Sequence, residues 1–165
     1  MTERKDGKET RRRLLNAACE VFAGNGYRDA KIAEICKRAG ANVAAVNYYF
    51  GDKASLYAET WRYAFEQFEQ PAFSEMTAGP PEQRLRQYIR ILVKNFFDTS
   101  DLGNFSRLYM MELANPSGLI PHQWREMIGP RRRRLLGIIR EILGPENDPQ
   151  TVFFCEMSII TQCRA

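Results

Sequence analysis

The sequence has little histidine and no cysteine pair at metal-binding spacing. Its 165 residues include one histidine, His122, and four cysteines, none of which stand in a CxxC arrangement. A tetrahedral zinc site needs four such ligands, so this composition argues against a bound metal. The cysteines suit small core positions in a reducing compartment instead; they are Cys19, Cys36, Cys155 and Cys163.

Long apolar runs are also missing. No stretch approaches the roughly 18–20 apolar residues that a membrane span requires. The N-terminus, MTERKDGKETRRR, is charged and is not followed by an apolar segment. We therefore expect a cytoplasmic chain with no membrane partner and no secretory signal.

Residue patterns typical of enzymes are sparse. The sequence contains no glycine-rich phosphate loop and no paired carboxylates in an obvious cleft. Glu112 and His122 stand on either side of a proline-containing turn, where such a pair is more often structural than catalytic. We expect a protein that is not an enzyme and that needs no cofactor.

The positive charge is unevenly distributed along the chain. Residues 1–53 carry 11 Lys and Arg against 7 Asp and Glu, whereas residues 54–165 carry 13 of each, so the first segment holds the whole net charge of +4. This asymmetry fits a polyanionic partner at one end of the molecule. Taken alone, a difference of this size is common on solvated surfaces.

Apolar residues at helical spacing are what the sequence has in plenty. They make up 44% of the chain, enough for a sizeable core, and no segment shows the alternation of a strand. The sequence therefore predicts an all-α fold. The expected helices cover residues 10–23, 31–38, 42–49, about four turns from residue 53, 82–97, 102–113, 122–143 and a last helix from residue 149.

Polar residues mark where several of these helices begin. Thr10 is expected to cap the first helix. Residues 1–9 before it are either a disordered terminus or a basic arm that contacts phosphate. Asp29 or Ala30 is the expected cap of the second helix, and Asp52 is expected to cap the long helix that follows residue 52.

The most informative stretch is residues 32–53, IAEICKRAGANVAAVNYYFGDK. Gly40 suits the left-handed residue that ends a helix, and Asn42 can cap the next helix by accepting from a backbone amide. In and directly after the helix expected over residues 42–49, only Val46 and Phe50 require burial, which leaves the other face of this helix for a partner. A helix, a glycine turn and a second helix with a small, polar and aromatic outer face form the layout of a DNA-reading helix-turn-helix.

The last third of the chain contains two further features. Pro130 is expected to kink or restart the helix over residues 122–143. The final helix is apolar over much of its circumference and stops at Ala165 in mid-pattern. Either the chain is truncated there, or a second copy of the chain covers this helix.

Residues 11–57 contain a combination of apolar, aromatic, glycine and lysine residues at characteristic positions. They are Ala18, Phe22, Gly26, Tyr27, Ile32, Ile35, Ala39, Gly40, Tyr49, Phe50, Lys53 and Leu56. As a combination, this set resembles the N-terminal domain of TetR-family transcriptional repressors. The form AGANVAAVNYYFGDK, with Tyr109-Met110-Met111-Glu112 further on, is more similar to the CecR-like branch than to others.

This resemblance implies a bacterial repressor with two helical domains. Residues 1–53 would form a three-helix DNA-binding domain, and residues 54–165 a helical domain for effector binding and dimerisation. Family members are homodimers whose recognition helices enter successive major grooves of a palindromic operator, and a small apolar or amphipathic effector releases them. Dimerisation in the family generally uses the last two long helices. This sequence has one of them, so we expect the second domain to be incomplete at its C-terminal end.

The resemblance also assigns DNA-contacting residues by position. Lys53 corresponds to the family's phosphate-binding lysine at the start of the helix after the recognition helix. The positions of the recognition helix that face DNA correspond to Asn42, Ala44, Ala45, Asn47 and Tyr49, with Tyr48 beside them.

Two of these positions depart from the family pattern. Lys31 stands where Thr or Ser is frequent, and it would strengthen attraction to the DNA backbone. Asn47 stands where Tyr is frequent, and its amide can pair with adenine or accept from cytosine, so we expect an altered base preference. Ala44 and Ala45 can make only apolar contacts, for instance with a thymine methyl group.

The effector site is expected in the core between the helices of the second domain. Methionines and aromatic residues suit an adaptable apolar pocket, but ordinary core packing is the alternative for each of them. Arg107 is the exception, because a charge within an apolar helix suggests an anionic ligand or a Glu112 partner. The candidates are Phe96, Phe97, Arg107, Tyr109, Met110, Met111, Trp124 and Met127.

The sequence therefore predicts a ligand-responsive repressor that binds a palindromic DNA operator as a homodimer and is released by a small molecule. The alternative is a helical small-molecule-binding or scaffold protein without operator binding.

Overall fold

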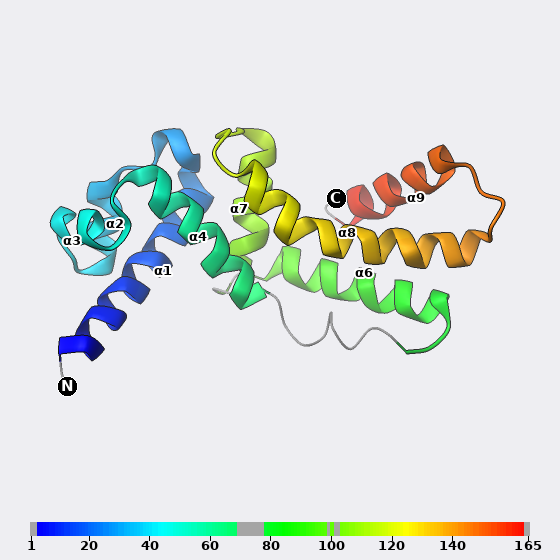
Figure 1. Ribbon diagram of the computed structural model, residues 1–165, viewed down its shortest axis with the longest axis horizontal. Coiled ribbons are helices and arrows are strands. Elements are labelled where there is room, and N and C mark those ends of the chain that lie inside the picture. Colours follow the sequence, from blue (N-terminus) through cyan, green and yellow to red (C-terminus); the bar gives the residue numbers. More distant parts are fainter. Residues whose placement is uncertain (1–2, 69–77, 99, 101–102, 164–165) are drawn as a thin grey trace. The chain divides into compact units, whose positions relative to one another are not determined.

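The computed structural model describes residues 3–68, 78–98, 100 and 103–163. In this part of the chain every regular element is an α-helix, which confirms the predicted all-α fold (Figure 1). The chain divides into two compact units, residues 1–68 with 99–123 and residues 69–98 with 124–165. The helices are α1 (Glu3–Asp29), α2 (Ile32–Ala39), α3 (Val43–Phe50), α4 (Lys53–Phe68), α6 (Pro81–Phe97), α7 (Asn104–Ala114), α8 (Pro121–Leu143) and α9 (Pro149–Gln162).

The first unit is built around α1, which packs against α2, α4 and α7. The apolar stripe of α1 meets the predicted apolar face of α4, and the side chains of both are almost completely removed from water. Burial of this apolar area is the main stabilising term of such a unit. Its largest fully buried residues are Leu14, Leu15, Phe22, Ile35, Leu56, Tyr57, Trp61 and Leu108.

The connection between α2 and α3 has the predicted turn chemistry. Gly40 has φ 59° and ψ 42°, the left-handed conformation that a residue without Cβ adopts at little cost. The Asn42 side chain accepts a hydrogen bond from the Ala45 amide at 2.9 Å and so caps α3. Asp52 caps α4 in the same way, by accepting from the Ser55 amide at 2.7 Å. These three predictions are confirmed.

The start of α1 differs from the prediction. The helix begins at Glu3, so Thr10 lies inside it and is not its cap, and residues 3–9 are helical and not a disordered arm. Good helix formers and an ion pair between Glu9 and Arg12 at 2.7 Å carry the helix through this region. Gly7 lies close to α3, since a Cβ there would stand 3.2 Å from the Tyr49 hydroxyl. Residues 1 and 2 lie outside the described part.

The end of α1 is also later than expected. α1 continues past residue 23 as far as Asp29, but Gly26, with φ 71° and ψ 175°, is not helical, so α1 consists of two helices that meet at a kink there. Lys31 is the N-cap residue of α2, and it makes no side-chain capping bond. The expectation that Asp29 or Ala30 caps α2 is therefore wrong, because Asp29 is still part of α1.

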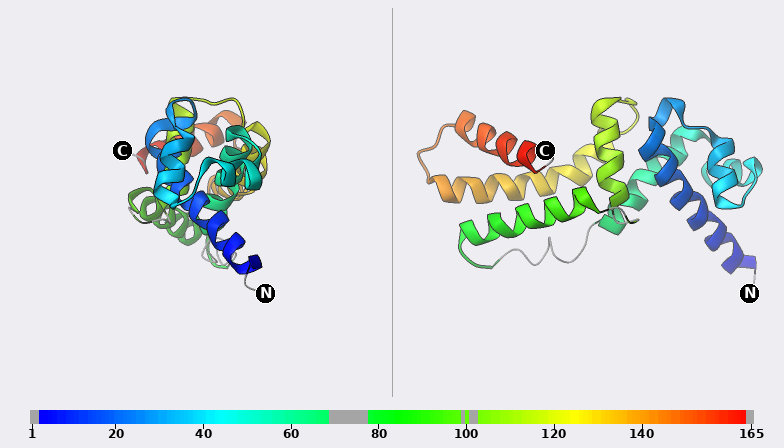
Figure 2. Two further views of the ribbon diagram at one scale, coloured as in Figure 1. Left: turned by 90° about the vertical axis from the view of Figure 1, so that its left-hand side faces the viewer. Right: turned by 180° about the vertical axis from the view of Figure 1, so that it is seen from behind.

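The second unit contains α6, α9 and α8 from residue 124 onward. Figure 1 and the right-hand view of Figure 2 show α6 and α8 side by side and antiparallel, with α9 returning along α8. Arg84 of α6 pairs with Glu141 of α8, and Arg132 of α8 pairs with Glu156 of α9 at 2.6 Å. The predicted bounds of α6 hold to within a residue.

α8 runs through Pro130 without a break. Of the two expected alternatives, a restart of the helix at this residue is wrong, and a kink stays a prediction. A proline inside a helix removes one backbone hydrogen bond, and here the helix continues for more than three further turns, over which Leu135, Ile138 and Ile139 are buried.

Phe105 is the residue that ties α7 to α4. Its ring contacts the rings of Trp61, Phe65 and Phe68, at centroid distances of 5.5, 5.1 and 4.8 Å. We predict that Phe105→Ala lowers the free energy of unfolding by about 3–5 kcal/mol, because it leaves a cavity in this cluster. Urea denaturation followed by circular dichroism measures the change. Phe97→Ala is the control, since Phe97 is 67% exposed and its removal is expected to cost less than about 0.5 kcal/mol.

Candidate DNA-binding interface

α3 presents an outer face that the protein itself leaves uncovered. Only Val46 and Phe50 of this helix are buried. Tyr48 is 82% exposed, an unusual position for a large aromatic ring that has no partner outside the chain. Val43, Ala44 and Asn47 are exposed beside it. The face is thus small, polar and aromatic, as the sequence predicts.

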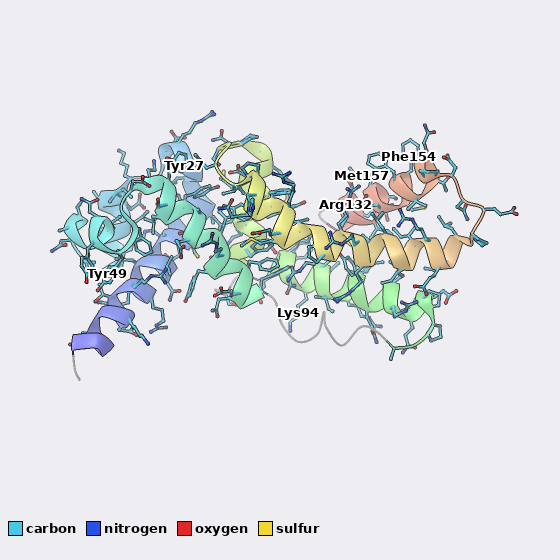
Figure 3. The ribbon with its side chains drawn as sticks, viewed as in Figure 1. Tyr27, Tyr49, Lys94, Arg132, Phe154 and Met157 are labelled. Atoms are coloured by element: carbon cyan, nitrogen blue, oxygen red, sulfur yellow. The ribbon has the colours of Figure 1, made fainter. Side chains whose placement is uncertain are left out.

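Contacts beneath α3 fix the direction of this face. The Arg11 guanidinium lies 5.3 Å from the centroid of the Phe50 ring and also pairs with Glu59 of α4 at 2.8 Å. Tyr49 packs edge-on against Tyr48 at 4.9 Å and contacts Phe50 at 6.2 Å (its position is labelled in Figure 3). α1 and α4 therefore brace α3 from its inner side, and the ring of Tyr48 is left to point outward.

Lys53 is the first residue of α4 and follows Asp52, whose carboxylate caps this helix by accepting from the Ser55 amide. Its ammonium donates a hydrogen bond to the Arg28 carbonyl at 3.1 Å and stands 4.8 Å from the centroid of the Tyr27 ring. An ammonium has three N–H donors, so this arrangement leaves donors for a phosphate oxygen. The lysine thus lies three residues after the C-terminal end of α3.

Lys31 is exposed at the N-terminus of α2. Because no side chain caps this helix, its first amides remain available to an anion together with the lysine charge. The nearby Arg38 is already neutralised by Glu20 at 3.0 Å and Glu34 at 2.8 Å. These ion pairs raise the pKa of Arg38, chiefly through the hydrogen bond to Glu20.

The structure brings all eight predicted DNA-contacting residues to the α2, α3 and α4 segment of the first unit. Ala45 and Tyr49 are half-buried, and the remaining recognition-helix candidates are exposed. Sequence reasoning missed Tyr27 and Arg28 as the groups that hold Lys53. The glycine that precedes Tyr27 was the available signal, since Gly26 breaks α1 and turns both residues toward α4.

The predicted effector residues do not share one compact unit. Arg107, Tyr109, Met110 and Met111 belong to α7 of the first unit. Phe96, Phe97, Trp124 and Met127 belong to the second unit.

Their burial and contacts differ as well. Met127 is buried, whereas Phe97 and Met110 are exposed and so are not core residues. The Arg107 guanidinium donates to Asn104 Oδ1 at 2.7 Å and to the Ser100 carbonyl at 3.0 Å. Glu112, the expected partner of Arg107, accepts from Tyr57 and Ser117.

Comparison with known families covers most of the chain. Residues 14–60 match the family described as bacterial regulatory proteins of the tetR family. Residues 81–165 match the family described as the C-terminal domain of the HTH-type transcriptional dual regulator CecR. The chain belongs to the TetR family of transcriptional regulators.

Curated relatives of this TetR-family chain agree with the assignment. The HTH-type transcriptional regulator BetI of Escherichia coli K12 / DH10B is 34% identical over 134 residues, which are 79% of this chain and 67% of that protein. The uncharacterised HTH-type transcriptional regulator YdgC of Bacillus subtilis is 43% identical over 53 residues, 32% of this chain and 27% of that protein. The TetR-family chain is thus a transcriptional regulator and not an enzyme.

Solved structures support the same fold. The hemolysin II transcriptional regulator HlyIIR superposes with a TM-score of 0.73 at 23% identity, covering 94% of this chain and 88% of that one. FadR of Bacillus subtilis, solved in complex with stearoyl-CoA, gives a TM-score of 0.70 at 19% identity, with 92% and 82% covered. Over the residues that the structure describes, no helix is long and apolar enough to cross a membrane.

Asp52 makes the stability of this TetR-family protein depend on pH. The Ser55 amide, which donates to the Asp52 carboxylate, is the main cause that lowers the pKa of Asp52. A lowered folded-state pKa stabilises the protein above the unfolded pKa, and that stability is lost as pH falls below about 4. We predict that Asp52→Asn, which keeps an acceptor for the cap, makes the melting temperature less dependent on pH between about 5 and 2.5 than it is in the wild type. Equal pH dependence of both proteins would contradict this.

Proposed function

We propose that this TetR-family regulator binds a palindromic operator as a homodimer, represses transcription and is released by a small molecule. Such a protein works in the cytoplasm, where bacterial DNA lies. The proposal assigns DNA binding to residues 1–53, and effector binding and dimerisation to the helical remainder, residues 54–165.

One observation carries the DNA-binding part of the proposal. The uncovered face of α3, with Tyr48 82% exposed, belongs to the same unit as Lys31 and Lys53, each at the N-terminus of a helix. Lysines at helix N-termini bind phosphates and fix the register on the duplex, while side chains of the intervening helix reach base edges. The geometry therefore supplies both kinds of contact that a DNA reader needs.

The base contacts must come from few side chains. Asn47 is exposed near the centre of α3 and can pair with an adenine or accept from a cytosine. Asn42 uses its side-chain oxygen to cap α3, so its amide nitrogen is the group left to donate to DNA. Tyr48 and Tyr49 offer hydroxyls and ring faces, and Ala44 and Ala45 offer methyl contacts.

An apolar surface on α9 supports the homodimer. Phe154 is 66% exposed, and Phe153 and Met157 are exposed beside it (Figure 3 labels Phe154 and Met157). Val152 and Glu156 are the buried residues of this helix, so α9 already uses one side within its own unit. A second copy of the chain would cover the remaining apolar side, as an isologous interface buries the same patch twice.

The effector proposal rests on the second family match and on the residue types of α6 and α8. FadR, a structural neighbour, was solved with stearoyl-CoA, an amphipathic molecule that carries a long apolar chain and phosphates. Methionines and aromatic rings adapt to such apolar chains. We propose the same class of effector for this chain, with contacts from the candidates that lie in the second unit, Phe96, Phe97, Trp124 and Met127.

Fluorescence anisotropy tests the operator proposal, with a labelled duplex from the DNA upstream of the gene. The wild type is expected to bind with a preference over scrambled DNA and with an affinity that falls steeply with salt. Asn47→Ala should reduce that preference by about 1–3 kcal/mol, because alanine cannot form the two hydrogen bonds that an amide makes with one base. Glu66→Ala, an exposed change at the far end of α4, is the control.

The same titration distinguishes the alternatives. If the wild type shows no sequence-preferring, salt-sensitive binding to DNA, the operator proposal is wrong. The alternative, a helical small-molecule-binding or scaffold protein, would then be favoured. Stearoyl-CoA, added to the preformed complex, should lower the anisotropy of the DNA if an acyl effector releases the operator. A melting temperature that stays unchanged with stearoyl-CoA would exclude this effector class and leave operator binding unaffected.

Phe154→Glu tests the dimer proposal. A carboxylate in the centre of the α9 surface is expected to shift the protein from dimer to monomer in analytical ultracentrifugation, because a buried unpaired charge costs several kcal/mol. Circular dichroism should stay unchanged, since Phe154 is exposed within its own chain. Thr151→Glu, at an exposed polar site on the same helix, is the matched control. A dimer that survives Phe154→Glu would rule out this surface as the interface.

A further inference from the structure

A series of contacts links Lys53 to the turn between α7 and α8, residues 115–118. It begins at the two groups that hold the lysine ammonium, the Arg28 carbonyl and the Tyr27 ring. Figure 3 labels Tyr27, which lies where the end of α1 meets the start of α4. The position of the Lys53 ammonium therefore depends on what fixes Tyr27 and Arg28.

Tyr27 packs against a buried tyrosine of α4 and, at 6.4 Å, against the ring of Phe22. The Tyr27 ring lies 5.1 Å from the ring of Tyr57, centroid to centroid. The Tyr57 hydroxyl in turn donates a hydrogen bond to Glu112 Oε2 of α7 at 2.7 Å. Tyr57 is 1% exposed, and this burial is the first cause that raises the pKa of Tyr57 far above its usual value. The hydroxyl therefore stays protonated and remains a donor at neutral pH.

Glu112 connects Tyr57 to the 115–118 turn. It is 7% exposed, and its Oε1 accepts from the Ser117 amide and from the Ser117 hydroxyl, both at 2.9 Å. A buried carboxylate is costly unless such bonds satisfy it. Its three donors come from only two places, Tyr57 and the turn, so the carboxylate holds these two together.

A second contact joins the same turn to the other group that holds Lys53. The Arg28 guanidinium donates to the Pro116 carbonyl at 3.4 Å. The Arg28 carbonyl is the acceptor for Lys53, so this one residue contacts both the lysine and the turn. The turn is thus tied on two sides to the residues that surround the ammonium.

We propose that Tyr57 and Glu112 are positioning residues for the contact between Lys53 and DNA phosphate. The inference rests on the proposed DNA binding. With the bond between Tyr57 and Glu112 made, Tyr27 is fixed and the ammonium is ordered before DNA arrives, which avoids the entropic cost of ordering it on binding. With the bond broken, the lysine retains its charge and loses its fixed position.

A double-mutant cycle between Tyr57→Phe and Lys53→Met tests this coupling in the full chain. Tyr57→Phe keeps the ring and removes only the hydroxyl. Binding to the labelled upstream duplex is measured at several salt concentrations. Lys53→Met should reduce the slope of log affinity against log salt by about 0.9 for each phosphate that the lysine neutralises in the wild type. Tyr57→Phe should weaken binding in the wild-type background and change it by less than about two-fold in the Lys53→Met background.

Two further variants separate positioning from general stability. Glu112→Gln can donate to the Tyr57 oxygen and accept from the Ser117 amide, so it should restore most of the binding that Glu112→Leu loses. Thr60→Val is the matched control, because it removes an equally buried hydrogen bond on α4, from the Thr60 hydroxyl to the Leu56 carbonyl at 2.7 Å. It should lower the melting temperature and leave the salt slope unchanged.

Each outcome bears on one of the two proposals. Additive effects of Tyr57→Phe and Lys53→Met, or a Thr60→Val variant that weakens binding as much as Tyr57→Phe, would overturn the positioning role while wild-type binding stands. A wild type that shows no salt-sensitive binding would overturn both the positioning role and the proposed operator binding.

Discussion

The burial of Val46 and Phe50 is the constraint on which the DNA-facing surface depends. α3 has eight residues, too few for a helix to be stable in water by itself. Its shape is maintained from outside, by the Asn42 cap at its start and by the Arg11 guanidinium over the Phe50 ring at its end. Because both buried residues are apolar and lie on one side, Asn47 and Tyr48 stay exposed on the other, while Tyr49 is half-buried between the two. The recognition surface is therefore a consequence of the packing beneath it.

Packing also explains why the first compact unit extends beyond the helix-turn-helix. α7 packs against α1 and α4 through Phe105 and Leu108, and Glu112 accepts a hydrogen bond from the hydroxyl of Tyr57. The unit that carries the DNA-facing helix thus includes a helix from the second half of the sequence. The predicted functional boundary at residue 53 therefore differs from the boundary that packing defines. The reason is that α4 packs against α1 and α3 and also against α7.

The helix-turn-helix was predictable because its signals are local. Gly40, Asn42 and Asp52 act on neighbours within three residues, so their roles can be read from spacing, and the family motifs reinforced them. The predictions that were wrong also relied on local signals. Thr10 resembles a cap but lies inside α1, where the Glu9–Arg12 ion pair supports the earlier start of the helix. Pro130 resembles a restart but lies inside α8, which buries Leu135, Ile138 and Ile139 further on. Lys31 became the first residue outside α2 because α1 extends to Asp29.

By itself the sequence determined an all-helical chain, the position of its helix-turn-helix, the Asn42 cap of α3, and its place among TetR-family regulators. It did so because helical periodicity, glycine turns and capping residues act over a few neighbours. Only the tertiary structure decided which groups surround Lys53, which partners satisfy Glu112, and which unit α7 joins. Most of these contacts join residues far apart in the sequence, such as Lys53 with Arg28 at 25 positions, Tyr57 with Glu112 at 55 and Arg28 with Pro116 at 88. No local pattern specifies such pairs, because they form only when distant helices pack against one another.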